Sequence, residues 1–303
     1  MNIVLRPFII PRQLASARYL MIHTALRSYN AQKQLFLATN YSGFSKSPKE
    51  NRFVIKQETF GDDAYFIVNS ISSRFDVFGV ADGVGGWKEY GVDPSLFSHL
   101  LMKNCKSYAK NYCVDSAFPL KILKTGYDTM LSEHPNLLGS STACVMVIDK
   151  ITGMLYSVNL GDSGFVIIRD HFIIYQSKEQ QHYFNAPYQL TCKTPDQSFL
   201  GNMPSEADEY SFLLKSDDII IMATDGLFDN MTGKQILDIV SNQQKHNSQR
   251  IANCLVEEAR KLAFDECYIS PFVRKARMHG IYATGGKPDD ITVIVACARS
   301  PVQ

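Results

Sequence analysis

The stretch VFGVADGVGGW, from Val77 to Trp87, is the feature around which the rest of the chain is organised. Its first five residues are apolar or small and show no polar face, which predicts a β-strand buried on both sides. Asp82 ends this strand, and a buried acid is costly unless a cation meets it. The glycines that follow allow a tight turn and bring backbone carbonyls close to a ligand. Taken alone, the pattern fits a turn aspartate as well as a functional one.

Acidic residues also stand at the ends of other apolar, strand-like runs. LYSVNLGD ends at Asp162, IIIMATDG contains Asp225, and ITVIVACA follows directly after two aspartates. In an antiparallel sheet a strand starts where its neighbours end, so acids that follow three strands and precede a fourth can meet at one edge. The full set of these acids is Asp62, Asp63, Asp82, Asp162, Asp225, Asp229, Asp289 and Asp290.

Carboxylates gathered at one edge repel one another unless cations lie between them. Carboxylates with a backbone carbonyl, and no nearby His or Cys, are the ligands of a hard ion such as Mg²⁺ or Mn²⁺. Two such ions can share a water, lower its pKa and neutralise the charge of a transferring phosphoryl group. The pattern therefore indicates metal-dependent phosphoryl chemistry, with scattered turn aspartates as the alternative.

The composition is that of an ordinary globular chain. Its 303 residues are 45% hydrophobic and 20% charged, enough for one large domain with a sizeable core. A net charge of +1 gives no reason to expect a nucleic-acid partner. No stretch approaches the roughly 18 consecutive apolar residues of a membrane span. The 7 cysteines include no CxxC pair, which favours reduced, buried thiols over disulfides or a zinc site.

The N-terminal segment differs from the rest, because no acidic residue occurs before Glu50. Arg and Lys are scattered through it among short apolar stretches. An Arg-bearing, acid-free, partly amphipathic leader is typical of a mitochondrial transit peptide, and a disordered basic tail is the alternative. We predict that residues 1–49 are this leader and that residues 50–303 form one catalytic domain.

Periodicity predicts helices in pairs between groups of strands. We expect helices near residues 94–108, 119–132, 233–242 and 248–264. We expect strands at residues 64–70, 75–81, 142–148, 154–160, 164–169, 172–176, 210–214, 218–224 and 291–298, and a long surface loop over 180–204. Because many strands are joined by hairpins, the pattern predicts an α+β fold with sheets inside and helices outside.

The spacing Cys-x5-Arg from Cys254 to Arg260 matches that of cysteine phosphatases. Their chemistry needs a tight loop whose N–H groups surround the phosphate. Here the intervening residues are helix formers, and Glu257 and Glu258 would repel a phosphate dianion. We interpret the segment as part of a helix.

Four motifs, VADGVGGW, GDSG, ATDGLFD and GKPDDITVI, occur in an order that resembles the PP2C (PPM) family of metal-dependent Ser/Thr protein phosphatases, from Gly61 to Ala298. The segments YGVDP, EQQHYFN and GGKPDDITV resemble its mitochondrial branch, the yeast Ptc-seven-type enzymes and their animal homologues. The resemblance implies a four-layer α-β-β-α sandwich: two mainly antiparallel sheets, flanked by helix pairs, with metals at one edge.

The resemblance also implies the direct metal ligands. Asp82 matches the ligand that bridges two Mn²⁺ or Mg²⁺ ions, and Gly83 matches the residue that offers its backbone carbonyl. Asp225 and Asp289 match the other direct carboxylates. Asp289 fits better than Asp290, because the family motif is Asp followed by Asn.

Other acids match supporting positions. Asp63, together with Asp62, matches the acidic pair that holds metal-bound waters. Asp162 and Asp229 match acids that hold a third, weaker ion. The catalytic residues are then Asp82, Asp225 and Asp63.

Two positions depart from the family pattern. Val84 stands where many members have a His that can protonate the leaving group, and Val cannot transfer a proton. Glu58 stands where many members have an Arg that grips the phosphate, with only Lys56 nearby. Lys287, in the sequence GGKP, is interpreted as a turn residue, with contact to phosphate as the alternative.

The resemblance implies a protein Ser/Thr phosphatase of the mitochondrial matrix. It implies in-line attack of a metal-bridging water on phosphoserine or phosphothreonine, without a covalent intermediate. We expect a monomer that acts on phosphorylated mitochondrial proteins, including those of ubiquinone synthesis. Two alternatives stay open: a catalytically weak or dead scaffold that binds phosphoproteins, and a hydrolase of small phosphoesters.

Overall fold

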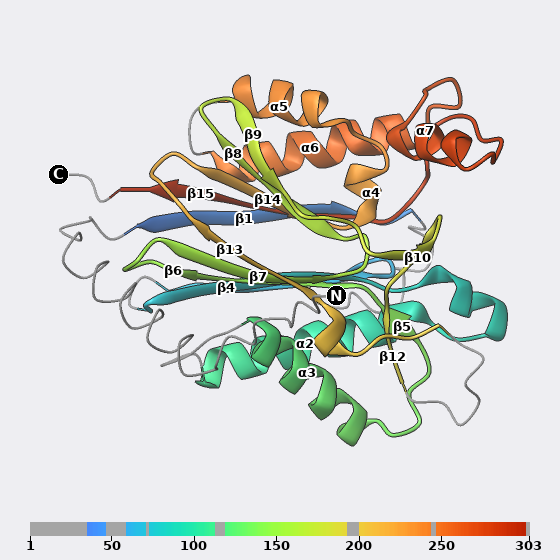
Figure 1. Ribbon diagram of the computed structural model, residues 1–303, viewed down its shortest axis with the longest axis horizontal. Helices are drawn as coiled ribbons and strands as arrows, with labels where there is room; N and C mark the ends of the chain where they lie inside the picture. Colours follow the sequence, from blue (N-terminus) through green and yellow to red (C-terminus); the bar gives the residue numbers. More distant parts are fainter. Residues whose placement is uncertain are drawn as a thin grey trace, which may run out of the picture.

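The computed structural model describes residues 35–46, 59–70, 73–112, 119–192, 200–243 and 247–300. Two antiparallel sheets lie face to face in it (Figure 1). The five-stranded sheet runs β1 (Phe36–Phe44), β15 (Ile291–Arg299), β14 (Ile219–Ala223), β8 (Gly164–Arg169) and β9 (Phe172–Gln176). The six-stranded sheet runs β13 (Asp208–Leu213), β7 (Met154–Leu160), β6 (Ala143–Asp149), β4 (Phe75–Asp82), β3 (Asp63–Val68) and β2 (Thr59–Phe60).

Helices cover the outer faces of both sheets (Figure 1). The six-stranded sheet carries α2 (Pro94–Tyr112) and α3 (Pro119–Glu133). On the other side of the sandwich lie α4 (Asp225–Phe228), α5 (Gly233–Ser241), α6 (Ser248–Ala263) and α7 (Pro271–Met278). Short 3₁₀ helices are η2 (Gly85–Tyr90) and η3 (Pro204–Glu206). This arrangement confirms the predicted α+β, four-layer sandwich.

Strand β4, which ends at Asp82, is buried on both of its faces, as predicted. Val77 packs in the core beneath α2 and α3, whereas Phe78 and Val80 pack in the core between the two sheets. Successive side chains of a strand point to opposite faces. An uninterrupted apolar run is therefore what a strand inside a four-layer sandwich requires.

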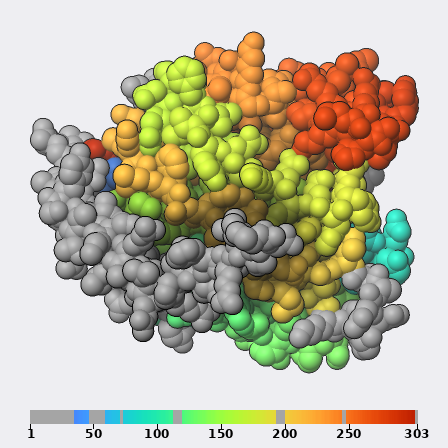
Figure 2. Space-filling model, in the orientation of Figure 1, coloured from blue at the N-terminus to red at the C-terminus, as the bar shows by residue number. Residues whose placement is uncertain are grey.

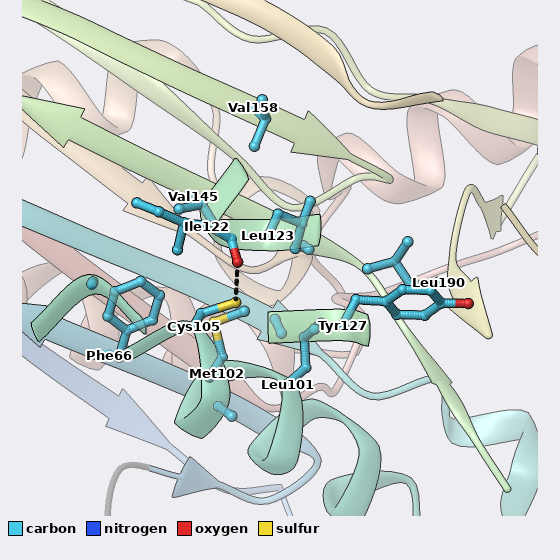
Figure 3. Close-up of a cluster of buried hydrophobic side chains, with 14 of the residues drawn as sticks. Phe66, Leu101, Met102, Cys105, Ile122, Leu123, Tyr127, Val145, Val158 and Leu190 are labelled. Carbon is cyan, nitrogen blue, oxygen red and sulfur yellow. Dashed lines mark hydrogen bonds between the residues drawn. The ribbon is translucent and has the colours of Figure 1, made fainter. Parts of the chain in front are cut away.

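The helix pair α2 and α3 packs closely on its sheet (Figure 3). A Cβ on Gly126 would lie 2.5 Å from Cys105 Sγ, so only glycine permits this approach of the two helices. Cys105 is a free, buried thiol, and its Sγ lies 3.7 Å from the Ile122 carbonyl oxygen. Cys144, Cys192 and Cys297 are also free and buried, as expected, whereas the free Cys254 is half-buried and the free Cys267 is exposed.

The predicted domain boundary after residue 49 is wrong. Strand β1 pairs with β15 along its whole length, from Phe36 opposite Arg299 to Phe44 opposite Ile291. Leu37 packs toward the core between the sheets, and Ala38 packs toward α6. Strand β1 contains no charged residue, so the absence of acids does not separate such an edge strand from a leader. Residues 1–34 lie outside the described residues, so the transit peptide stays a prediction.

Two further differences concern connecting segments. The predicted loop over residues 180–204 contains the short ladders β10 (Gln181–Tyr183) with β11 (Ala186–Pro187), and β12 (Leu190–Thr191) with β5 (Ser140–Ser141). These strands are too short to show a period. The α7 helix was not predicted, although Ser270 caps it by accepting a hydrogen bond from the Val273 N–H. In the described part of the chain, no helix is both long and apolar enough to span a membrane.

Candidate metal centre

The acids named in the sequence come together where the two sheets meet. Asp63 begins β3 and lies opposite Asp82, the last residue of β4. In the facing sheet, Asp225 begins α4 just after β14. The two sheets are joined here, because Asp63 Oδ2 accepts hydrogen bonds from the hydroxyls of Thr224 and Thr292, each at 2.8 Å.

The glycine after Asp82 has a clear steric role. A Cβ on Gly83 would lie 2.6 Å from the Pro94 carbonyl oxygen and 2.8 Å from the Asp62 carbonyl oxygen. The Gly83 N–H also donates to the Asp62 carbonyl at 3.1 Å. Because any larger residue would clash with these two carbonyl oxygens, only glycine allows the backbone at residue 83 to lie this close to Asp62 and Pro94. Trp87 packs beside this turn, and its Nε1–H donates to Ser140 Oγ at 2.6 Å.

The cluster is short of positive charge. Burial raises the pKa of Asp82 well above its usual value, and the neighbouring Asp225 and Asp63 raise it further. Burial also raises the pKa of Asp63, with Asp290 adding to the effect. Burial and Asp225 raise the pKa of Asp162, and Lys287 partly opposes them. The acids thus disfavour one another's ionisation when no added cation is present.

Within the described residues, three carboxylate oxygens of the cluster are buried with neither a hydrogen-bond nor an ion-pair partner: Asp63 Oδ1, Asp162 Oδ1 and Asp225 Oδ1. Buried polar atoms are almost always satisfied, so such oxygens point to an absent partner. Carboxylate oxygens are hard ligands, and this donor set fits Mg²⁺ or Mn²⁺. As they stand, no three acidic, His or Cys side chains among the described residues form a ready metal shell.

Two lysines lie between the acids, and sequence reasoning missed their positions. Lys287 Nζ lies 2.5 Å from Asp225 Oδ2, 2.7 Å from Asp229 Oδ2 and 3.4 Å from Asp289 Oδ2. Lys46 Nζ lies 2.7 Å from Asp289 Oδ1. Although burial works against it, Asp289 and Asp290 raise the pKa of Lys46. Lys46 belonged to the predicted leader, so no local signal could have placed it here.

Asp289 and Asp290 point to different surroundings. The Asp290 carboxylate accepts hydrogen bonds from the backbone N–H groups of Lys46 and Asp62, both at 2.8 Å. It therefore braces the segment after β1 against the start of β3. Asp289 instead faces the lysines within the cluster. Both Asp289 oxygens lie near a lysine ammonium group, Oδ1 near Lys46 and Oδ2 near Lys287, so the role of Asp289 as a metal ligand stays a prediction.

The remaining candidates lie around the same cluster. Asp62 forms an ion pair with Lys88 of η2 at 2.8 Å. Asp229 lies 3.7 Å from Lys275 Nζ, which also pairs with Glu179. The structure thus brings all eight predicted acids to one edge. Their function as metal ligands stays a prediction.

Comparison with known proteins agrees with this site and fold. Residues 78–299 match the family described as Stage II sporulation protein E (SpoIIE). The chain belongs to this SpoIIE/PP2C family and is a protein phosphatase. This result confirms the predicted family and enzyme class.

Two vertebrate relatives of this chain have the same name. The chain is 43% identical to "Protein phosphatase PTC7 homolog" of Homo sapiens over 265 residues, which cover 86% of each chain. It is 44% identical to the protein of the same name of Danio rerio over 259 residues, covering 84% of this chain and 86% of that protein.

Solved structures agree with the fold. The photosystem II phosphatase PBCP has a TM-score of 0.74 and 30% identity, covering 86% of this chain and 98% of that one. The catalytic domain of the serine threonine protein phosphatase PstP, in complex with 2 manganese ions, has a TM-score of 0.52 and 15% identity, covering 88% and 99%. The PstP likeness concerns the fold alone.

Proposed function

We propose that this protein is a metal-dependent Ser/Thr protein phosphatase of the mitochondrial matrix. The observation that carries the proposal is the cluster of buried carboxylates from both sheets, with three oxygens left without a partner. The manganese ions named with PstP, a protein of the same fold, support a divalent cation here. Residues 1–34, which precede β1, carry no acid and include Arg6, Arg12 and Arg18, and this composition supports the matrix as its location.

The residues that would hold the ions are Asp82, the Gly83 carbonyl, Asp225 and Asp289, with Asp63 holding bound water. When bound, divalent ions neutralise phosphoryl charge and lower the pKa of water. The chain itself holds the carboxylates of these ligands in position. Hydrogen bonds from the threonines that follow β14 and begin β15 fix the Asp63 carboxylate, and the β4 turn fixes Asp82.

Hydrolysis in this proposal is an in-line attack of water without a covalent intermediate. The segment from Cys254 to Arg260 lies within α6, as predicted, so its N–H groups serve the helix and cannot surround a phosphate. Val84 offers no proton to the leaving alkoxide, so the proton must come from water. Phosphorylated mitochondrial proteins, including those of ubiquinone synthesis, are the substrates we propose from the family resemblance.

The test uses the purified chain and a phosphoserine peptide, with Mn²⁺ and then with EDTA. We expect EDTA to abolish phosphate release. We expect Asp82→Asn to lower kcat/KM by a factor of about 100 or more, because several kcal/mol of charge stabilisation is lost. Asp128→Asn, an exposed acid of α3, is the matched control. Full activity in both EDTA and Asp82→Asn would overturn the proposal.

A catalytically dead scaffold is the second candidate, because Lys46 and Lys287 already neutralise part of the cluster. The three unpartnered oxygens argue against it. Calorimetric titration with Mn²⁺ separates the two. Heat from binding at micromolar to millimolar Mn²⁺ supports the phosphatase, and no binding supports the scaffold. Comparing turnover of phosphopeptides and small phosphoesters tests the substrate class.

A further inference from the structure

The ammonium group of Lys287 occupies one side of the acid cluster. It lies within hydrogen-bond distance of Asp225 Oδ2 and Asp229 Oδ2, and 3.4 Å from Asp289 Oδ2. An ammonium group has three N–H donors and no acceptor. Three carboxylate oxygens therefore surround Lys287 Nζ in the way that they would surround a small metal ion.

Neighbouring residues hold Lys287 in this position through its backbone. The Lys287 N–H donates to Asn230 Oδ1 at 2.8 Å, and Asn230 Nδ2 donates to the Lys287 carbonyl, also at 2.8 Å. The same Nδ2 donates to the Gly226 carbonyl of α4 at 3.0 Å. Because Asn230 is fully buried, this clamp fixes the turn GGKP to the helix that begins at Asp225.

An aromatic ring supports the side chain as well. Lys287 Nζ lies 5.1 Å from the centroid of the Phe272 ring, a favourable cation–π contact. Phe272 in turn packs on Phe184, with 5.3 Å between ring centroids, and its N–H donates to the Asp229 carbonyl at 3.0 Å. Figure 2 shows the α7 region, which contains Phe272, in orange-red at the upper right of the view. Two independent contacts therefore direct the lysine toward Asp225 and Asp229.

The two oxygens of Asp225 have different surroundings. Its Oδ2 accepts a hydrogen bond from Lys287, whereas its Oδ1 is buried without a partner. One oxygen thus stays available for an ion on the side of Asp82. The other oxygen, and Asp229, already have a cation. A divalent ion placed at this second position would lie at contact distance from the ammonium charge and be repelled by it.

We propose that Lys287 is the resident cation of the Asp225–Asp229 position and takes the place of a third divalent ion. The inference rests on the proposed function, and it replaces the expectation that Asp162 and Asp229 hold a third, weaker ion. Asp162 lies within the electrostatic reach of Lys287, so the same lysine also offsets its charge. The chain then binds ions on the Asp82 side of the cluster only.

The experiment counts Mn²⁺ bound to the full chain, stripped of metal and dialysed against saturating Mn²⁺, by elemental analysis. We expect about two ions for the wild type and about three for Lys287→Met. The double variant Lys287→Met with Asp229→Asn should return to about two. Lys124→Met, which removes an exposed lysine of α3, is the charge-matched control and should equal the wild type. Equal counts in wild type and Lys287→Met overturn the inference.

A second measurement keeps the inference testable if Lys287→Met does not fold. Asp229→Asn in the otherwise unchanged chain should leave the count unchanged, because lysine rather than metal is the partner of Asp229. A count of three in the wild type, falling to two in Asp229→Asn, overturns this inference and leaves the proposed function intact. Absence of Mn²⁺ binding in every variant overturns both.

Discussion

Asp63 shows how a single residue connects the fold to the site. Its Oδ2 accepts hydrogen bonds from Thr224, which follows β14, and from Thr292 of β15, and its Oδ1 has no partner among the described residues. The Thr224 hydroxyl also accepts a hydrogen bond from the Thr292 N–H at 3.0 Å. One oxygen thus fastens the carboxylate, and the other stays available for a bound water or ion.

The substitution Thr292→Val should lower both stability and metal affinity. Valine keeps the shape but leaves a charged oxygen with one hydrogen bond fewer, which costs about 1.5–3 kcal/mol of unfolding free energy. Loss of such an orienting contact typically weakens metal binding about 10–100-fold. Urea denaturation and Mn²⁺ titration measure the two effects.

The matched control for this test is Thr39→Val in the neighbouring region of the same sheet. The buried Thr39 hydroxyl has no hydrogen-bond partner within the described ranges, so its removal should cost little and leave Mn²⁺ affinity unchanged. Equal effects of the two substitutions would show that the Asp63 contact is unimportant.

The strand β1 is one of the elements that sequence patterns missed, and the site depends on it. It ends at Phe44, and two residues later the Lys46 side chain pairs with Asp289 while its N–H donates to the Asp290 carboxylate. The strand also covers one side of β15, whose alternate residues line both cores. Removing it would leave β15 as an exposed apolar edge.

Truncation tests this dependence. A chain that begins at residue 35 keeps every described strand and should unfold cooperatively. A chain that begins at residue 50 lacks β1 and Lys46. We expect it to be largely unfolded or aggregated, because a domain has only about 5–15 kcal/mol of stability. Thermal denaturation followed by circular dichroism measures both chains, and equal melting temperatures would contradict the role given to β1.

The far end of the six-stranded sheet carries a pH-dependent contact. Arg74, just before β4, donates to both carboxylate oxygens of Asp149 at the end of β6, at 3.0 and 2.6 Å. Burial alone would raise the pKa of Asp149, but hydrogen bonds from Arg74, Thr152 and the Ile151 N–H outweigh it and lower the pKa. The ionised form is therefore favoured by folding. Its contribution is present above the unfolded pKa of about 4 and is lost as pH falls through the folded pKa.

The substitution Arg74→Met should reveal this contact. The arginine side chain is 46% exposed, so solvent screening limits the cost to about 1 kcal/mol at pH 7. The stability difference between wild type and variant should shrink below about pH 4 as Asp149 becomes protonated. Denaturation curves at several pH values measure it. A difference that stays constant down to about pH 2 would contradict the assignment.

At the scale of the whole molecule, the site exists only because two sheets pack together. The six-stranded sheet contributes Asp63 and Asp82, and the segments that follow and precede strands of the other sheet contribute Asp225 and Asp289. An ion held by both groups would bind the folded sandwich and not the unfolded chain.

Metal binding should therefore stabilise the whole sandwich. At a free Mn²⁺ concentration of about 100 times Kd, linkage predicts about 2.7 kcal/mol of added stability. The gain should vanish in Asp82→Asn and persist in Asp128→Asn. Differential scanning calorimetry with and without Mn²⁺ measures it, and an equal gain in Asp82→Asn would place the ion elsewhere.

Much of the fold could be predicted from local patterns. Continuous apolar runs marked β4 and β15, because strands covered on both faces need no polar side. The predicted strands 164–169 and 172–176 leave two residues between them for a turn, and these residues, Asp170 and His171, have positive φ, 48° and 66°. The β1 strand could not be separated from a leader, since a lightly charged edge strand has no strong alternation. The ladders near Gln181 and Leu190 are too short to leave a period.

Local sequence is enough to predict which strands are buried on both faces and that acids stand at their ends, because both features depend on neighbouring residues. Which cations contact those acids follows from the folded arrangement alone. Lys46 arrives from a distant edge strand, and Lys287 is directed by Asn230 and Phe272, which are separated from it along the chain. Charge pairing depends on distance in space, and local sequence does not encode that distance.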